Sequence, residues 1–185
     1  RVDTAVITSV IFPEVLRYSI FKDYFETRGL ELIYTKYGKK YADFSIGYFQ
    51  MKPSFVESLE KYVLQTSELS EKFGHFPIYK DTRERKIRAE RIRRLKSFEW
   101  QMDYLHCFYI LTGKLHSVSQ WKNKEDKIRF FATAYNHGFY KDTEEIKEWI
   151  NVPVFPYGAN SKSRQYIYSD ISCYFYNNNY KRIFK

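Results

Sequence analysis

The fold class is decided by residues 92–109, which read IRRLKSFEWQMDYLHCFY. Apolar side chains recur here every three or four residues, at Ile92, Leu95, Phe98, Met102, Leu105 and Tyr109. This spacing places them on one face of an α-helix. We therefore predict a central core helix that begins at Asp81 and runs through this stretch, in a mainly α protein.

The same spacing predicts further helices on both sides. They run from Thr4 to Tyr18, from Phe21 to Tyr37 with an interruption or cap near Gly29, from Ser54 through Leu69, from Asn123 to Gly138, from Asp142 to Ile150, and from Arg164 to Phe175, where helical and strand-like features alternate. Ser54 and Glu57 fit a capping box, in which both side chains bond free backbone amides. Asn123 and Asp142 are favourable N-cap residues for the two helices that follow them.

The bulk composition fits one globular domain. The chain has 185 residues, of which 44% are hydrophobic, and a net charge of +9. An anionic partner is therefore plausible, although charge alone does not select nucleic acid, an acidic membrane or a wall polymer. The weakly polar stretch Thr4–Val15 is too short to span a bilayer, so we expect a soluble chain.

Two cysteines, Cys107 and Cys173, predict neither a zinc site nor a disulfide framework, although a single bridge stays open. Cys107 lies in an apolar run, which favours a buried, inert thiol. We expect no metal and no cofactor. The first residue is Arg1 and not Met, which fits removal of an export signal or a shortened chain.

Three separated features carry chemistry. Glu14 follows Ile11 and Phe12, an apolar setting that favours a protonated carboxyl group. The segment Ser45-Ile46-Gly47-Tyr48-Phe49-Gln50-Met51-Lys52-Pro53 has a glycine that allows close backbone approach and an amide that can bind sugar hydroxyls. The segment Ala132-Thr133-Ala134-Tyr135-Asn136-His137-Gly138 combines small residues with polar ones.

The order of these features resembles the lytic transglycosylase and goose-type lysozyme superfamily. The segment from Ser163 to Ile171 is similar to the end of these enzymes. The resemblance implies a lysozyme-like single domain over residues 1–185 that cleaves peptidoglycan. It implies Glu14 as the general acid and base, and a sugar site formed by Ser45, Gly47, Phe49, Gln50, Tyr135, Asn136 and Tyr166. It also implies that Tyr135 lies near the acid and helps to orient it.

The chain departs from the family pattern in two places. Val15 follows Glu14, and Ser45 comes later than is usual, so Glu26 and Glu31 are rival acids if Glu14 faces away from the groove. Lys52 stands where goose-type lysozymes carry an acidic residue. Asp43 is a rival base, although a solvated turn residue is the simpler interpretation.

We therefore favour the one-acid route of a lytic transglycosylase, which leaves anhydro-muramic ends, over a hydrolase. The implied partner is the peptidoglycan glycan strand. The protein is expected to act as a monomer in the bacterial periplasm, at the cell envelope or after secretion, with peripheral envelope contact and without nucleic acid.

Two other functions stay open. The basic stretch 83–94 could neutralise nucleic-acid phosphates, but Glu84 with Arg88 and Glu90 with Arg94 are spaced for ion pairs along a solvated helix face. A catalytically silent glycan-binding domain would keep the same shape without the chemistry.

Overall fold

The computed structural model describes residues 2–20, 24–116 and 121–183, without the side chains of 19, 20 and 24–27. The chain divides into two compact units: unit 1 comprises residues 1–17 and 108–185, and unit 2 comprises residues 18–107. Helices dominate both, and within the described residues the strands form one two-stranded sheet. The predicted mainly α class is confirmed.

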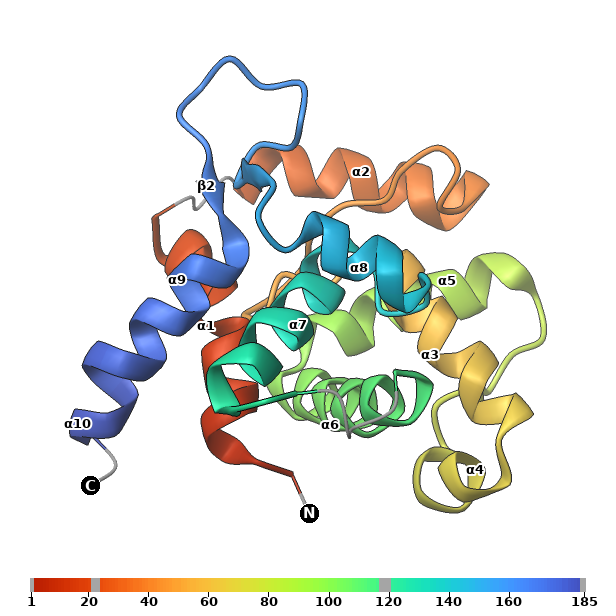
Figure 1. The fold of residues 1–185 in the computed structure, drawn as a ribbon. Coiled ribbons are helices and arrows are strands. Elements are labelled where there is room, and N and C mark those ends of the chain that lie inside the picture. The colour runs from red at the N-terminus through yellow and green to blue at the C-terminus, as the bar shows by residue number, and fades with distance from the viewer. Residues whose placement is uncertain (1, 21–23, 117–120, 184–185) are drawn as a thin grey trace. The chain divides into compact units, whose positions relative to one another are not determined.

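Unit 1 is built around α7 and α9, which pack along each other (Figure 1). Its elements are most of α1 (Thr4–Ile20), the end of α6 (Phe98–Leu115), α7 (Lys124–His137), α8 (Thr143–Trp149), β1 (Pro153–Phe155), β2 (Tyr166–Ile167), α9 (Tyr168–Phe175), the π-helix η2 (Tyr176–Tyr180) and α10 (Lys181–Ile183). Phe12 of α1 stacks on Phe175 of α9, with ring centroids 4.1 Å apart. The α1 helix is thereby fixed to the rest of the unit.

Local capping sets the ends of α7 and α8, as predicted. The Asn123 side chain accepts a hydrogen bond from the Asp126 amide at 2.9 Å, and Asp142 accepts one from the Glu145 amide at 2.8 Å. Gly138 has φ +130° and closes α7, with its amide bonded to the Ala134 carbonyl. These contacts lie within four residues along the chain, which is why the sequence alone could reveal them.

The predicted C-terminal helix begins later than expected. Residues 166 and 167 form β2, which pairs antiparallel with β1 in the register Pro153↔Ile167 and Phe155↔Tyr166. Because this pairing uses their backbone groups, the helix starts only at Tyr168. The prediction of helix over the first part of residues 164–175 was wrong.

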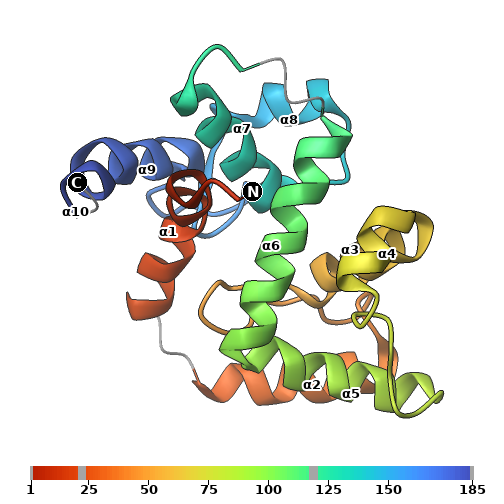
Figure 2. The ribbon, with the colours of Figure 1, turned by 90° about the horizontal axis from the view of Figure 1, so that it is seen from below.

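Unit 2 contains α2 (Tyr24–Tyr37), α3 (Pro53–Gln65), α4 (Ser67–Phe73), α5 (Glu84–Lys96) and the first part of α6. The α2 helix packs against α5 (Figure 2). It continues through Gly29, so the expected interruption there was wrong, while the expected start at Phe21 lies outside the described residues. Gly38, with φ +86°, follows the last residue of α2, as predicted.

Two predicted continuous helices are each broken by one extended residue. Thr66 separates α3 from α4, and Ser97 separates α5 from α6. The Ser97 amide bonds to the Arg94 carbonyl and closes α5, while the Ser97 carbonyl accepts from the Gln101 amide and opens α6. A single serine therefore ends one helix and starts the next, so the single long core helix predicted from Asp81 is in fact two.

The predicted capping box at Ser54 is also absent. The α3 helix starts at Pro53, and the Ser54 amide and hydroxyl both donate to Asp43, at 3.0 and 2.7 Å. Glu57 instead accepts from the Tyr34 hydroxyl and pairs with Lys39. Asp43 therefore caps α3 from the preceding loop, a role that the sequence assigned to Glu57.

The two cysteines are free and buried. Burial raises the pKa of the Cys107 thiol to about 12 and that of Cys173 to about 11. Both thiols therefore stay protonated at neutral pH, and the single bridge left open by the sequence is not formed. Among the described helices, none combines the length and the apolar character that a membrane crossing requires.

Candidate active site

The proposed acid, Glu14, is buried on α1, with a relative exposure of 5%. Its position on a helix with Val6 and Val10 fully buried explains why the carboxyl group faces inward. The Arg17 guanidinium lies 3.5 Å from Glu14 Oε2, one turn further along α1. A buried carboxyl group at this position is unusual for an ordinary amphipathic helix, where acidic residues line the solvated face.

Tyr135 lies within the electrostatic reach of Glu14. It projects from the last turn of α7 into the core of unit 1, where its ring meets Phe108 edge-on at 5.2 Å. Burial and then the negative charge of Glu14 raise the pKa of Tyr135 well above its ordinary value. Two residues far apart in the sequence therefore lie close together, and the phenol keeps its proton at neutral pH.

A second phenol, Tyr168, was missed by the sequence analysis. It begins α9, is 3% exposed, and donates a hydrogen bond to the Val10 carbonyl at 3.1 Å. Burial, followed by the charge of Glu14, raises the pKa of Tyr168 well above its ordinary value. Because Val10 lies one turn before Glu14, Tyr168 holds the helix that carries the acid.

The family resemblance places Tyr166, and not Tyr168, in the sugar site, and this stays a prediction. Tyr166 is 45% exposed, and the Arg164 guanidinium lies 5.3 Å from its ring centre. The residue that reaches the acid is two positions later, at the start of α9. The sequence shows a tyrosine at both 166 and 168. Which of the two lies near Glu14 depends on the boundary between β2 and α9, which the sequence does not reveal.

Asn136 is half-buried at the end of α7. The neighbouring His137 stacks on Trp149 of α8, with ring centroids 4.0 Å apart, and its Nε2 lies 3.2 Å from Glu145 Oε1. Burial, and then the Lys141 charge, lower the pKa of His137. These contacts give His137 a packing role between α7 and α8.

The residues predicted from Ser45 to Gln50 lie in unit 2, in a tight turn closed by the bridge between Ile46 and Met51. Two residues of the turn have positive φ, Gly47 at +74° and Gln50 at +51°. The Gln50 side-chain amide donates to the Gly47 carbonyl at 2.8 Å. Ser45 is half-buried before the turn. The Gln50 amide therefore stabilises the turn.

Gln101 holds this turn through side-chain hydrogen bonds, and the sequence did not identify it. It is fully buried on α6, accepts from the Phe49 amide at 2.8 Å, and donates to the Ile46 carbonyl at 3.3 Å. Its position three residues before the buried Tyr104 was the available signal, since a polar residue on an inward helix face needs a partner.

Gly47 leaves space for this amide. A methyl group built on Gly47 would lie 1.6 Å from Gln101 Nε2 and 2.5 Å from the Leu95 carbonyl oxygen. The glycine is therefore required by both its backbone conformation and the close approach of Gln101.

We expect Gly47→Ala to lower the free energy of unfolding by about 1–3 kcal/mol through its backbone conformation alone, with a further loss from the displaced Gln101 amide. Gly158→Ala is the matched control, because Gly158 has φ +81° and a methyl group added there would meet no atom within 4 Å. Urea denaturation of the two variants measures the difference. Equal losses would show that the approach of Gln101 contributes nothing.

Aromatic side chains around the turn divide into buried and exposed ones. Phe49, predicted to contact sugar, is 5% exposed and packs against Phe98 at 5.7 Å between centroids. Tyr48, Tyr18 and Phe98 are 46%, 36% and 48% exposed, and Tyr48 contacts both of the other rings. Tyr48, not Phe49, therefore presents an open ring beside Gln50.

The rival carboxylates are engaged elsewhere within unit 2. Asp43 caps α3 through Ser54, and Glu31 pairs with Lys96 at 2.7 Å. The side chain of Glu26 lies outside the described residues. Within the described part of the chain, no group of His, Cys, Asp and Glu side chains could hold a metal ion.

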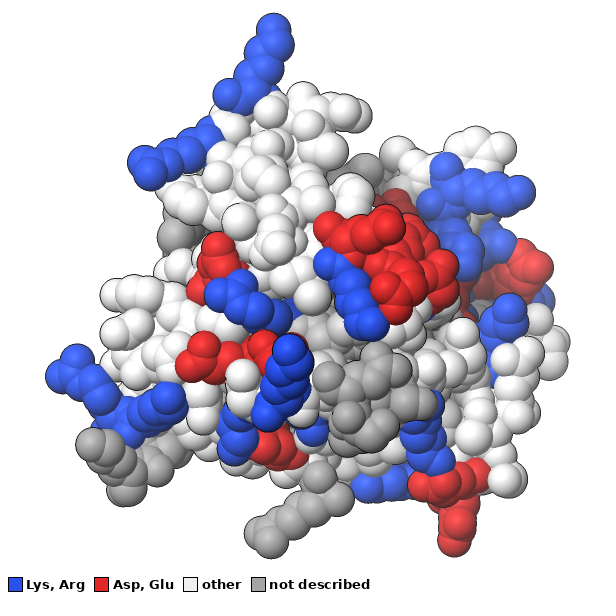
Figure 3. Space-filling view, viewed as in Figure 1, with Lys and Arg blue, Asp and Glu red and all other residues white. Residues whose placement is uncertain are grey.

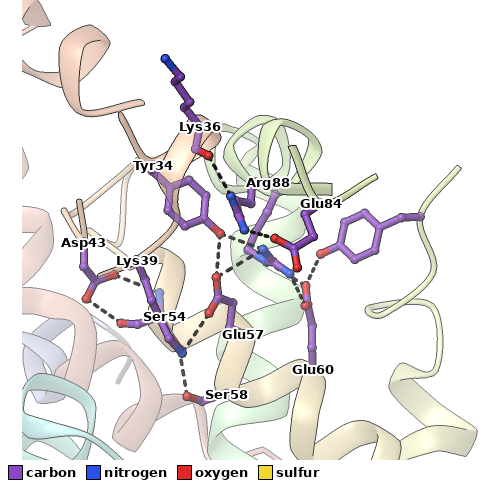
Figure 4. A network of polar contacts seen from close by, with 12 residues as sticks. Tyr34, Lys36, Lys39, Asp43, Ser54, Glu57, Ser58, Glu60, Glu84 and Arg88 are labelled. Carbon is purple, nitrogen blue, oxygen red and sulfur yellow. Dashed lines mark hydrogen bonds and ion pairs between the residues drawn. The ribbon is translucent and has the colours of Figure 1, made fainter. Parts of the chain in front are cut away.

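The basic helix α5 uses much of its charge inside unit 2. Arg91 forms a two-point ion pair with Glu60, at 2.7 and 3.3 Å, and donates to the Tyr34 hydroxyl at 2.7 Å. Figure 4 shows Tyr34, Glu57 and Glu60 converging on this position. Arg94 is also buried and donates to the Phe76 and Ile78 carbonyls. These two guanidinium groups are not available to a nucleic acid.

The predicted helix-face ion pairs are present as well, between Glu84 and Arg88 and between Glu90 and Arg94. In unit 1, acidic side chains gather over α8 on the face shown in Figure 3. Such a patch would repel a phosphate backbone. The nucleic-acid interpretation of residues 83–94 therefore loses Arg88, Arg91 and Arg94, whose guanidinium groups are engaged within unit 2.

Comparisons with models of protein families, with curated proteins and with solved structures gave no match to this chain.

Proposed function

We propose that this chain is a peptidoglycan lytic transglycosylase in which Glu14 is the general acid and base. The observation that supports the proposal best is the burial of Glu14 within the electrostatic reach of two protonated phenols, Tyr135 and Tyr168. Burial of a carboxyl group favours its protonated form, which a general acid needs, whereas the Arg17 guanidinium 3.5 Å away favours the carboxylate, which must accept a proton in the second step.

The proposed reaction needs one carboxyl group. Glu14 protonates the glycosidic oxygen between the muramic acid and glucosamine residues while positive charge grows on the sugar ring. The resulting carboxylate then accepts the proton of the muramic acid 6-hydroxyl as that oxygen bonds to the anomeric carbon. The products are a shortened strand and a 1,6-anhydro end, and the enzyme regains its proton.

The one-acid route fits the described carboxylates better than a two-acid hydrolase. Asp43, the rival base, is held by the amide and hydroxyl of Ser54. Lys52 occupies the position of the goose-type acid and is exposed. On this proposal Asn136 is a sugar contact of unit 1, and Ser45, Gly47 and Gln50 are sugar contacts of unit 2, with Tyr48 in place of Phe49. The enzyme acts at the bacterial cell envelope.

Mass analysis of muropeptides released from purified peptidoglycan tests the proposal. We expect anhydro-muramic ends without a net addition of water. Reducing ends alone would establish hydrolysis and overturn the one-acid route. Binding to cell walls without any released product would indicate a catalytically silent glycan-binding domain.

Tyr168 is proposed as a positioning residue for the acid. Tyr168→Phe removes the hydrogen bond to the Val10 carbonyl and should lower kcat about tenfold, because the helix carrying Glu14 loses an anchor. KM should change little, since Tyr168 is buried. Tyr174→Phe on the same helix is the matched control, because Tyr174 is 64% exposed. A rise in KM at constant kcat would contradict the positioning role.

A further inference from the structure

A pocket of about 440 Å³ lies in unit 2 between α2 and the start of α5. Its lining consists of Thr35 from α2 and of Arg83, Arg85, Lys86 and Ala89. Three of these five residues carry a positive charge. The volume lies within the range of small-molecule sites, which is about 300–1,000 Å³. None of these residues belongs to the proposed glycan site.

Some charges near the pocket are already neutralised. Arg83 binds Asp81 through two nitrogens, with its terminal nitrogen 2.6 Å from Asp81 Oδ2. The hydrogen bonds from Arg83 lower the pKa of Asp81, and the charge of Lys86 adds to this effect, so Asp81 stays ionised. Arg88 pairs with Glu84 and donates to the Lys36 carbonyl at 3.2 Å, as Figure 4 shows.

Arg85 and Lys86 differ from Arg83 and Arg88 in their ion pairing. Both are exposed, and neither forms an ion pair with any acidic residue that the structure describes. The pocket therefore has two cations outside any salt bridge with a described acidic residue, and of these Lys86 interacts with Asp81 through its charge alone. An anion that entered it would gain their attraction without first breaking an internal salt bridge.

We propose that this pocket binds the phosphate group of a small phosphomonoester. The planar Arg85 guanidinium matches two phosphate oxygens, and the Lys86 ammonium adds a compact charge. Thr35 supplies a hydroxyl for a third oxygen. The Ala89 methyl group and the aliphatic stems of the basic residues leave room for the organic part of the ligand.

A single phosphate group suits this site better than a nucleic-acid backbone. A backbone requires basic groups at successive phosphates along a surface. The later arginines of α5 are all engaged: Arg88 pairs with Glu84, Arg91 with Glu60 and Arg93 with Glu90, while Arg94 donates to backbone carbonyls. Among the cations of α5, only Arg85 and Lys86 therefore remain outside ion pairs with the described acidic residues.

Calorimetric titration of the whole chain with glycerol 3-phosphate and with inorganic phosphate tests the proposal. We expect saturable binding that the double variant Arg85→Glu/Lys86→Glu weakens by about tenfold or more. Lys61→Glu/Lys162→Glu is the matched control, because it makes the same change in net charge at exposed positions outside the pocket. This control should bind like the wild type. Circular dichroism checks that both variants are folded.

A second arm identifies the source of the phosphate. Saturable binding to phosphatidic acid vesicles, lost in the same double variant, would assign the phosphate to a lipid headgroup. The absence of saturable binding to every phosphate probe overturns the proposal, as does an equal loss in both double variants. Binding to duplex DNA but to none of the small phosphates or vesicles would also overturn it, in favour of a nucleic-acid partner. The proposal does not depend on glycan cleavage, so the two fail separately.

Discussion

Glu14→Gln should lower the rate of glycan-strand cleavage about a thousandfold, because an amide cannot donate the proton that the leaving oxygen needs. The substitution keeps the size and shape of the side chain, so the buried site in unit 1 stays filled. Its direct structural cost is the Arg17 ion pair, whose atoms are 3.5 Å apart. Loss of turbidity of purified cell walls measures the rate.

Glu148→Gln is the matched control for this variant. Glu148 is exposed on α8, and the same chemical change there should leave the rate unaltered. Glu14→Gln should still bind cell walls in a pull-down, which separates loss of chemistry from loss of folding. Full activity of Glu14→Gln would refute its role, and Glu31→Gln would then be the next variant to assay.

Arg91→Ala should lower the free energy of unfolding by about 3–5 kcal/mol, because it leaves the Glu60 carboxylate buried without its partner. Arg91 and Glu60 are each 7% exposed. Although burial alone lowers the pKa of Arg91, the hydrogen bonds and charge of Glu60 outweigh it and raise that pKa. Urea denaturation followed by circular dichroism measures the loss.

Arg93→Ala on the same helix is the control. Arg93 pairs with Glu90 on the surface, and its side chain is 65% exposed, so we expect a loss of about 0–1 kcal/mol. The double variant Arg91→Met/Glu60→Leu should recover most of the stability, since it removes both buried charges. Equal losses for Arg91→Ala and Arg93→Ala would show that burial adds nothing to the Arg91 pair.

The candidate site was predictable only in part. The sequence indicated Glu14 and Tyr135, and the structure places them within electrostatic reach of each other in unit 1. It did not indicate Tyr168 or Gln101. Both act through contacts with segments far away in the chain, to the Val10 carbonyl and to the turn at Phe49. Such partners leave no local pattern in one sequence.

The sequence also did not reveal which of two neighbouring aromatic side chains is buried and which is exposed. Phe49 is buried and Tyr48 exposed, while Tyr166 is exposed and Tyr168 is buried within electrostatic reach of Glu14. Adjacent positions in a turn, or at a strand end, point in different directions. Only the backbone conformation, set by Gly47 and by the pairing of β1 with β2, decides which one is buried.

The sequence by itself determined the helical class and those helix ends whose capping partners lie within one turn, such as Asn123 and Asp142. Tertiary structure decided the break at Ser97 and the capping of α3 by Asp43. It also decided the burial of Arg91 and Arg94 in a strongly charged helix. The physical reason is that a local hydrogen bond depends on residue types a few positions apart, whereas burial depends on which distant surfaces meet.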